Sequence, residues 1–400
     1  MKEDEPVIVI SMSATVCDET AGTEKKLGIF NARNGDGRMA YGYSIYFGRF
    51  LKYSGFDDHV VIPDGVREIG EGAFRDCLGL TSVVIPEGVT AIEDLVFCGC
   101  KNLVSVSLPD SLEYIGDGTF IHCDSLKSIH LPERLEKIGK SAFYHCSSLN
   151  SVVLPDGITE IAGGAFQFCS GLTSVIIPDS VKSIGSSSFD GCAGLTSIEI
   201  PESVTEIGPN AFSGCTGLTS VNIPESVEII GEAAFHGCRG LADNDGFVTK
   251  QGILFSYHGK DSDIIIPDGV KVISDEAFYS RKQIKSVRIP DSVMKIGFGA
   301  FNNCAAMASV NIPGSVTDIG KSAFEKCVSL TSVAIPEGVK VIREQTFYGC
   351  TSLTSVIMPD SVVKIEDLAF ANCPRIMIVC SKDSYTHHFC QRNHLSCTAG

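Results

Sequence analysis

Apolar and polar positions follow each other along this chain in a pattern that repeats every 23 residues. One copy, residues 192–212, reads CAGLTSIEIPESVTEIGPNAF. An Ile and a Phe stand at fixed distances after the proline in all thirteen copies, and a Cys follows the Phe in twelve, with Arg281 as the exception. The prolines that mark the copies are Pro63, Pro86, Pro109, Pro132, Pro155, Pro178, Pro201, Pro224, Pro267, Pro290, Pro313, Pro336 and Pro359. A fixed period of this kind decides the architecture before any local motif does.

Each copy predicts two short strands separated by a turn. The segment before the proline, such as residues 195–200, is rich in β-branched residues and alternates near its end, which indicates a strand. The proline and the acidic residue after it fit the corner of a β-turn. The following V-x-x-I predicts a second short strand, and a frequent Gly after the Ile lets the chain bend. The segment A-F-x-x-C then closes the coil through a helical or 3₁₀ turn.

A single 23-residue unit cannot bury its own apolar face, whereas stacked copies bury a continuous one. The pattern therefore predicts a solenoid of about thirteen coils with parallel short strands, mostly β with short helical or 3₁₀ turns. At the spacing of parallel strands, about 4.8 Å, thirteen coils span about 60 Å.

These residues resemble the leucine-rich repeat family, and specifically its BspA-like, Treponema-type branch. The units of that branch carry the same LxxIxLPxxLxxIxxxAFxxC text, and the resemblance covers residues 44–375. It implies a leucine-rich repeat solenoid. It also implies a bacterial or protozoan surface protein linked to adhesion to host matrix or to other cells.

Two breaks in the period predict the domain organisation. Between Pro224 and Pro267 one coil is replaced by an insertion in which residues 252–261 match residues 48–57, each just before a copy of I-P-D-G-V. Each match predicts a hairpin that opens a block of coils. The expected parts are a non-repeat segment 1–43, a first block 44–240 of a hairpin and eight coils, a second block 241–375 of a hairpin and five coils, and a cap 376–400.

The cap predicts a last strand at residues 376–379 and a helix at 384–393. At 100° per residue, Tyr385 and Phe389 share the helix face that covers the core. Five residues of zinc-ligand type also lie in this tail: Cys380, His387, Cys390, His394 and Cys397. Three of them fall within about 60° of one another on the opposite face. They form a weak metal candidate with non-standard spacing, and an ordinary polar outer face is the alternative.

Twelve cysteines form a column through the predicted stack: Cys77, Cys100, Cys123, Cys146, Cys169, Cys192, Cys215, Cys238, Cys304, Cys327, Cys350 and Cys373. Stacked Cβ atoms stay about 4.8 Å apart, whereas a disulfide prefers about 3.8 Å. A straight column does not converge on a metal ion, and histidine does not repeat along it as a base for a nucleophile. Buried, reduced, small apolar residues are the preferred interpretation, with some disulfides as the alternative.

The charge balance narrows the choice of partners. With 48 acidic against 32 basic residues the net charge is −16. Such a field repels nucleic acid and anionic lipid and favours a basic partner. The residue after the proline is acidic in twelve of thirteen copies, from Asp64 to Asp360, which predicts an acidic rim. A solvated turn residue is the alternative interpretation of this column.

Membrane insertion is not expected, because no run approaches the roughly 18 apolar residues of a span. The start, MKEDEPVIVISMSATVC, also lacks the features of a secretory signal. We therefore keep a cytoplasmic location open beside the surface location that the resemblance implies.

The strand face is the expected binding surface. Its second outward position is almost always Ser, and the position two residues later varies freely. A uniform frame with one variable column is typical of a recognition surface, with neutral variation on a solvent face as the alternative. The candidate ligand-binding residues are Val84, Ser107, His130, Val153, Ile176, Glu199, Asn222, Arg288 and Asn311. Val153 and Ile176 predict a small apolar patch.

The sequence thus favours a non-enzymatic interaction or adhesion module that binds a protein or glycan ligand on its strand face. The alternative is an intracellular scaffold or host-directed effector, which the missing signal and abundant thiols favour. An enzyme is a weak third, because no Ser-His-Asp spacing, phosphate loop or recurrent acid–base pair stands out. No cofactor and no catalytic residue is expected.

Overall fold

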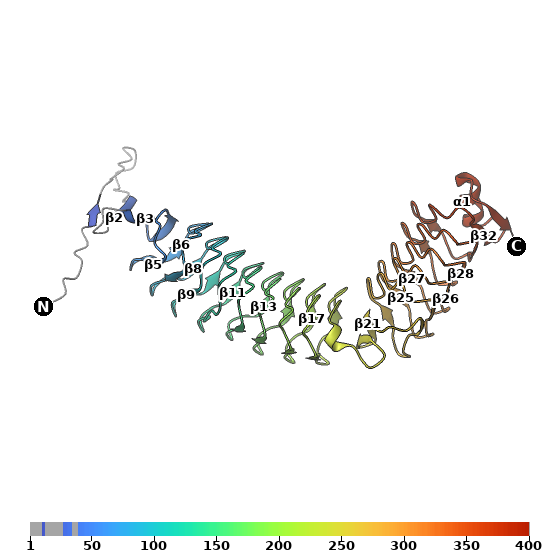
Figure 1. Ribbon diagram of the computed structural model, residues 1–400, viewed down its shortest axis with the longest axis horizontal. Coiled ribbons are helices and arrows are strands. Elements are labelled where there is room, and N and C mark those ends of the chain that lie inside the picture. The colour runs from blue at the N-terminus through green and yellow to red at the C-terminus, as the bar shows by residue number, and fades with distance from the viewer. Residues whose placement is uncertain (1–9, 13–26, 34–38, 400) are drawn as a thin grey trace. The chain divides into compact units, whose positions relative to one another are not determined.

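The computed structural model describes residues 10–12, 27–33 and 39–399. Much of the predicted non-repeat segment 1–43 lies outside these residues. The chain forms two compact units, unit 1 (Met1–Ala234) and unit 2 (Phe235–Gly400). Each unit is a stack of coils with short strands, as the ribbon in Figure 1 shows. The predicted boundaries of the four domains stay a prediction.

Unit 1 consists of coils that carry a first and a second short strand, except that the coil at residues 128–130 has no assigned first strand. The first strands are β5 (His59–Val61), β7 (Ser82–Val84), β9 (Ser105–Ser107), β12 (Ser151–Val153), β14 (Ser174–Ile176), β16 (Ser197–Glu199) and β18 (Ser220–Asn222). The second strands are β6 (Glu68–Ile69), β8 (Ala91–Ile92), β10 (Tyr114–Ile115), β11 (Lys137–Ile138), β13 (Glu160–Ile161), β15 (Ser183–Ile184), β17 (Glu206–Ile207) and β19 (Ile229–Ile230). Neighbouring strands pair in parallel between residues 23 positions apart, as Ser151 does with Ser174.

Unit 2 repeats this plan after a short 3₁₀ helix, η1 (Arg239–Leu241). Its first strands are β22 (Asp263–Ile265), β24 (Ser286–Arg288), β26 (Ser309–Asn311), β28 (Ser332–Ala334) and β30 (Ser355–Ile357). Its second strands are β23 (Val272–Ile273), β25 (Lys295–Ile296), β27 (Asp318–Ile319), β29 (Val341–Ile342) and β31 (Lys364–Ile365). The predicted solenoid of 23-residue coils with parallel strands is confirmed, with strands shorter than the six residues expected at 195–200.

An antiparallel hairpin precedes the coils of each unit, at the two places where the sequence motif predicts one. In unit 1, β3 (Met39–Tyr46) pairs with β4 (Arg49–Tyr53), and β1 (Ile10–Met12) and β2 (Leu27–Arg33) extend the same sheet. In unit 2, β20 (Phe247–Lys250) pairs with β21 (Ile253–Tyr257). Both hairpins turn through two residues with positive φ, at 47–48 and 251–252, as two-residue hairpin turns require.

The core of each unit contains a stack of phenylalanine rings, one from each coil. In unit 1 the rings of Phe50, Phe74, Phe97, Phe120, Phe143, Phe166, Phe189 and Phe212 stack with centroids 5.0–5.5 Å apart. In unit 2 the rings of Phe278, Phe301, Phe324, Phe347 and Phe370 do the same at 4.9–5.6 Å. The invariant Phe of the repeat is thus the residue that joins successive coils through the core.

The A-F-x-x-C segment closes each coil through single turns bonded between residues three apart. In the first coil Ala73 N–H donates to the Gly70 carbonyl, and Cys77 N–H donates to the Phe74 carbonyl. Gly72 (φ 58°) and Asp76 (φ 59°) lie in the left-handed region, and every later coil has two such residues at the same places. These residues break each segment into separate turns, because left-handed residues do not continue a right-handed helix.

Eleven of the twelve column cysteines are buried, as predicted, and Cys77 at the start of the column is half-buried. Ten of its thiols donate to the carbonyl of a Phe 26 residues earlier, for example Cys192 Sγ to Phe166 O at 3.1 Å. The Phe166 carbonyl also accepts from the Cys169 N–H, so both of its acceptor sites are used. The sixteen cysteines within the described residues are free thiols. The column therefore supplies hydrogen bonds between coils as well as filling space.

We expect the buried column to resist alkylation in the folded protein. Burial raises the pKa of the Cys100 thiol to about 12 and that of Cys373 to about 11, so little thiolate is present. Iodoacetamide at about pH 8, where an exposed thiol is partly ionised, should label half-buried Cys77, Cys98 and Cys397 first. Mass analysis before and after unfolding counts the labels. Labelling of Cys192 in the folded protein as fast as of Cys98 would contradict this expectation.

Arg281 replaces the cysteine in one coil of unit 2 and makes a different contact. Its Nη2 donates to His258 Nδ1 at 3.0 Å, and His258 Nε2 lies 2.9 Å from Ser256 Oγ. Burial and then the Arg281 charge lower the pKa of His258 to about 4. The single break in the column thus ties the first full coil of unit 2 to its opening hairpin.

The C-terminal cap contains the predicted strand and helix, with one error of orientation. The strand is β32 (Met377–Cys380), the helix is α1 (Tyr385–Asn393), and β33 (Cys397–Ala399) adds a parallel strand. Ser384 Oγ accepts from His387 N–H as the N-cap, and Tyr385 and Phe389 pack against the core. In the described part of the chain, no helix is long and apolar enough to span a bilayer.

Candidate functional site

The first strands of each unit expose the column that the sequence analysis singled out. All nine candidate residues are exposed, whereas most residues directly before a candidate, such as Val152 and Val175, are buried. Alternation along each strand produces this result, because successive side chains point to opposite faces. Val153 and Ile176 are register partners in β12 and β14, with 58% and 60% of their surfaces exposed. Two neighbouring apolar side chains are therefore open to solvent on this face.

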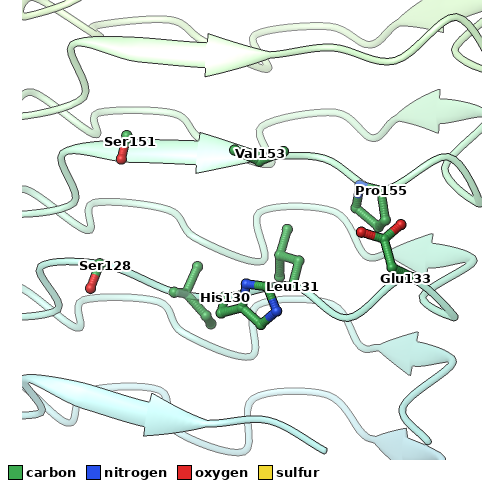
Figure 2. A pocket seen from close by; sticks show the side chains of 8 residues that line it. Ser128, His130, Leu131, Glu133, Ser151, Val153 and Pro155 are labelled. Atoms are coloured by element: carbon green, nitrogen blue, oxygen red, sulfur yellow. The ribbon is translucent and has the colours of Figure 1, made fainter. Parts of the chain in front are cut away.

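A small hollow lies beside this apolar pair. The coil at residues 128–130 forms no assigned strand, so the row of first strands is interrupted between β9 and β12. The hollow has a volume of about 130 Å³, and Figure 2 shows His130 of one coil beside Val153 of the next. It is lined by Ser128, Ile129, His130, Leu131, Glu133, Ser151, Val153 and Pro155. Apolar surface, an imidazole and a carboxylate thus meet at one place on the face.

The equivalent face of unit 2 has a wider hollow of about 430 Å³. Candidate residues Arg288 on β24 and Asn311 on β26 are register partners there. Ile265 on β22 is the register partner of Arg288 on its other side. Ser286 Oγ donates to Asp263 Oδ1 at 2.6 Å. This bond and a second from Ser262 lower the pKa of the Asp263 carboxyl. Both units therefore present outward serines with a variable residue beside them.

The predicted acidic rim is exposed in both units. In unit 1 it consists of Asp64, Glu87, Asp110, Glu133, Asp156, Asp179, Glu202 and Glu225. In unit 2 it consists of Asp268, Asp291, Glu337 and Asp360. None of the ion pairs formed by the described residues involves these carboxylates. A row of exposed carboxylates therefore lies next to the strand face.

Among the described residues, the five tail candidates do not form a metal site: Cys380, Cys390 and Cys397 lie near one another, but the two histidines do not join them. Cys390 is fully buried beside Thr386 on the inner side of α1, so its predicted place on the outer face with His387 is wrong. His394 lies past the helix end as a left-handed C-cap. The reason is that a thiol is apolar enough to enter the core, so the buried side of α1 includes Cys390 as well as the face of Tyr385 and Phe389.

A cluster that the sequence analysis missed lies in unit 1. His122, Asp124 and His145 are the one set of three metal-ligating side chains in the described part of the chain whose ligand atoms all lie within 4.8 Å of one another. Each histidine directly precedes a column cysteine in two successive coils. This repetition in two neighbouring coils was the sequence signal for the cluster. It is missed when histidine is required to repeat along the whole column.

Comparison with known proteins decides the family. A family model described as BspA type Leucine rich repeat region (6 copies) matches residues 49–173, 136–245 and 253–377. This chain belongs to the BspA-type leucine-rich repeat family. Its repeats are of a kind typically used for protein interaction. The resemblance based on the repeat text is thereby confirmed.

Two solved structures are similar to this BspA-type protein over nearly all of its length. A leucine-rich repeat protein from Bacteroides ovatus is 27% identical, with a TM-score of 0.58, over 91% of this chain and 99% of that one. A leucine rich cell surface protein from Faecalibacterium prausnitzii is 30% identical, with a TM-score of 0.57, over 99% of both chains. A search of curated proteins found no match.

Proposed function

We propose that this BspA-type protein is a non-enzymatic interaction module that binds a protein ligand across the first-strand face of unit 1. The observation that carries the proposal is the exposed pair Val153 and Ile176 beside the hollow at His130. Side chains of β-branched residues on rigid strands lose little entropy on binding and offer apolar area in a fixed place. An extended segment lying across several coils would contact one variable residue in each.

The acidic rim supports a ligand with basic residues at its flanks. Glu133 and Asp156 follow the hollow in two successive coils, and neither has an ion-pair partner among the described residues. Exposed charges of this kind raise the association rate and select partners more than they add affinity. The affinity for the ligand should therefore fall as salt concentration rises, while the contribution of the apolar contact stays unchanged.

The similar protein from Faecalibacterium prausnitzii is described as a cell surface protein. We propose the same location and an adhesive role here, with the ligand on another cell or in the surrounding matrix. Protease treatment of intact cells tests this location separately from binding. Complete protection of the protein on intact cells would contradict the surface location and favour a scaffold or effector inside the cell.

Substituting either member of the apolar pair should strongly weaken binding without unfolding the protein. We expect Val153→Asp and Ile176→Asp each to weaken capture of the ligand about tenfold or more, because each places a charge at the centre of the contact. The measurement is affinity capture from cell-surface and matrix extracts, with the bound proteins quantified by mass spectrometry. A ligand that is retained by the wild-type protein and lost by both variants is the expected result.

Two control variants carry the same change elsewhere. Ile229→Asp and Val363→Asp alter side chains that are 55% and 60% exposed outside the first strands, so they should keep full binding. If all four variants bind alike, the first-strand face is not the contact. If the captured protein is lost after removal of its glycans, the ligand is a carbohydrate and the protein-ligand proposal is wrong.

A further inference from the structure

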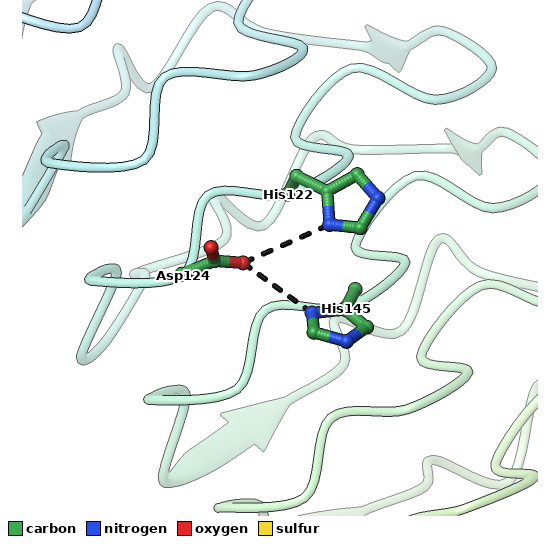
Figure 3. Close-up of side chains that lie close together, drawn as sticks. All are labelled: His122, Asp124 and His145. Carbon is green, nitrogen blue, oxygen red and sulfur yellow. Dashed lines mark hydrogen bonds and ion pairs between the residues drawn. The ribbon is translucent and has the colours of Figure 1, made fainter.

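Three side chains of metal-binding type converge on the surface of unit 1, away from the first-strand face. Asp124 Oδ1 lies 3.3 Å from His145 Nδ1 and 3.8 Å from His122 Nδ1. The two imidazole rings come from successive coils, with centroids 4.7 Å apart. Figure 3 shows both Nδ1 atoms directed at the same carboxylate oxygen.

The coils hold the three residues in place. His122 N–H donates to the Tyr144 carbonyl at 2.9 Å, and His145 N–H donates to the Gln167 carbonyl at 2.8 Å, so each histidine is bonded to the following coil. The Tyr144 ring packs edge-on against the His122 ring. Ser147 Oγ donates to the Asp124 carbonyl at 3.4 Å. Ligands on a hydrogen-bonded framework need little rearrangement to bind an ion.

We propose that His122, Asp124 and His145 form a binding site for a divalent transition-metal ion of the zinc class. In a tetrahedral zinc site the ligand atoms lie about 2.0–2.1 Å from the ion, which places neighbouring ligand atoms about 3.3 Å apart. The separations of 3.3 and 3.8 Å match this edge or exceed it slightly, and the ligand atoms of the two histidines lie within 4.8 Å of each other. Small rotations of the half-exposed side chains bring the three ligand atoms together around an ion.

The donor set selects the class of ion. Two imidazole nitrogens and one carboxylate oxygen suit zinc, nickel, cobalt or copper, whereas calcium and magnesium prefer oxygen alone. The three side chains are 35–44% exposed, so water reaches the fourth position. The bound ion would join two successive coils and leave one position for an outside ligand. This site and the proposed protein contact on the first strands do not depend on each other.

Isothermal titration of the full chain with zinc chloride tests the site. The variants His122→Asn and His145→Asn suit the backbone, because both positions are left-handed and Asn occupies the equivalent place at Asn303 and Asn372. We expect each variant to bind one equivalent of zinc less, or to bind it about tenfold or more weakly. His387→Asn, in the tail, should leave the zinc equivalent bound at the proposed site unchanged.

Cobalt distinguishes this site from the cysteines. Cobalt bound by two imidazoles and a carboxylate gives visible d–d bands without a thiolate-to-metal charge-transfer band. That spectrum, lost in His122→Asn and kept in His387→Asn, supports the proposal. Binding of cobalt through thiolate alone, unchanged binding in both unit 1 variants, or no saturable binding by the wild-type protein would each overturn it. Circular dichroism of every variant shows whether its fold is intact.

Discussion

Replacing Phe166 by Ala is expected to destabilise unit 1 by about 3–5 kcal/mol, the range for removal of a fully buried aromatic ring. Phe166 is completely buried, and its ring stacks between those of Phe143 at 5.3 Å and Phe189 at 5.5 Å. The Ala variant leaves a gap in the middle of the stack. Neither flanking ring can fill this gap, because each is held by its own coil.

The backbone contacts of residue 166 should survive the change, so the variant isolates the ring. The N–H of residue 166 donates to Ser188 O, and its carbonyl accepts from Cys169 N–H and Cys192 Sγ, none of which involves the side chain. In a solenoid each coil contacts only its neighbours, so a defect in the middle also weakens the coupling between the two halves of the stack. We therefore expect the unfolding transition to broaden as well as to shift.

Urea unfolding followed by circular dichroism measures the loss, and Phe56→Ala is the control. Phe56 lies in the same unit with 90% of its surface exposed, so its removal should change the free energy of unfolding by less than about 0.5 kcal/mol. A loss below about 1 kcal/mol for Phe166→Ala would contradict the role assigned to the stack.

The period was enough to predict the solenoid, because stacking is the one arrangement in which every copy buries the same apolar columns. The burial of Leu195, Ile198 and Ile200 and the exposure of Glu199 follow from strand alternation alone. The two opening hairpins were predictable for the same reason, since one motif occurs twice at the same distance from a coil. Features that repeat along the chain can thus be predicted from the sequence.

Features that join different columns were not predictable. His122 and Asp124 belong to one coil and His145 to the next, and their Nδ1 atoms reach one carboxylate only through the placement of side chains in two successive coils. The hydrogen bond from the Cys192 thiol to the Phe166 carbonyl likewise depends on how one coil is offset from the coil before it. Period and residue type contain no information on this offset.

Replacing Gly246 by Ala should force apart the two ends of the opening hairpin of unit 2, at a loss of about 2–5 kcal/mol. Two effects contribute. Gly246 has φ 89°, which costs a residue with a Cβ about 1–2 kcal/mol. Its Cβ would also collide with the backbone nitrogen and Cα of Gly259 on the facing segment, and overpacking of this kind costs about 1–3 kcal/mol. Backbone atoms cannot rotate away as a side chain can.

Gly269→Ala separates the two effects. Gly269 has nearly the same φ, 88°, but a methyl group added there would meet no atom of the described residues within 4 Å. We expect this variant to lose only the conformational part, about 1–2 kcal/mol. Hydrogen exchange should show faster exchange at the His258 amide, which donates to the Gly246 carbonyl, in Gly246→Ala alone. Equal losses in the two variants would mean that the hairpin yields to the added methyl group. The close approach of Gly246 to Gly259 would then not be what holds the two ends of the hairpin together.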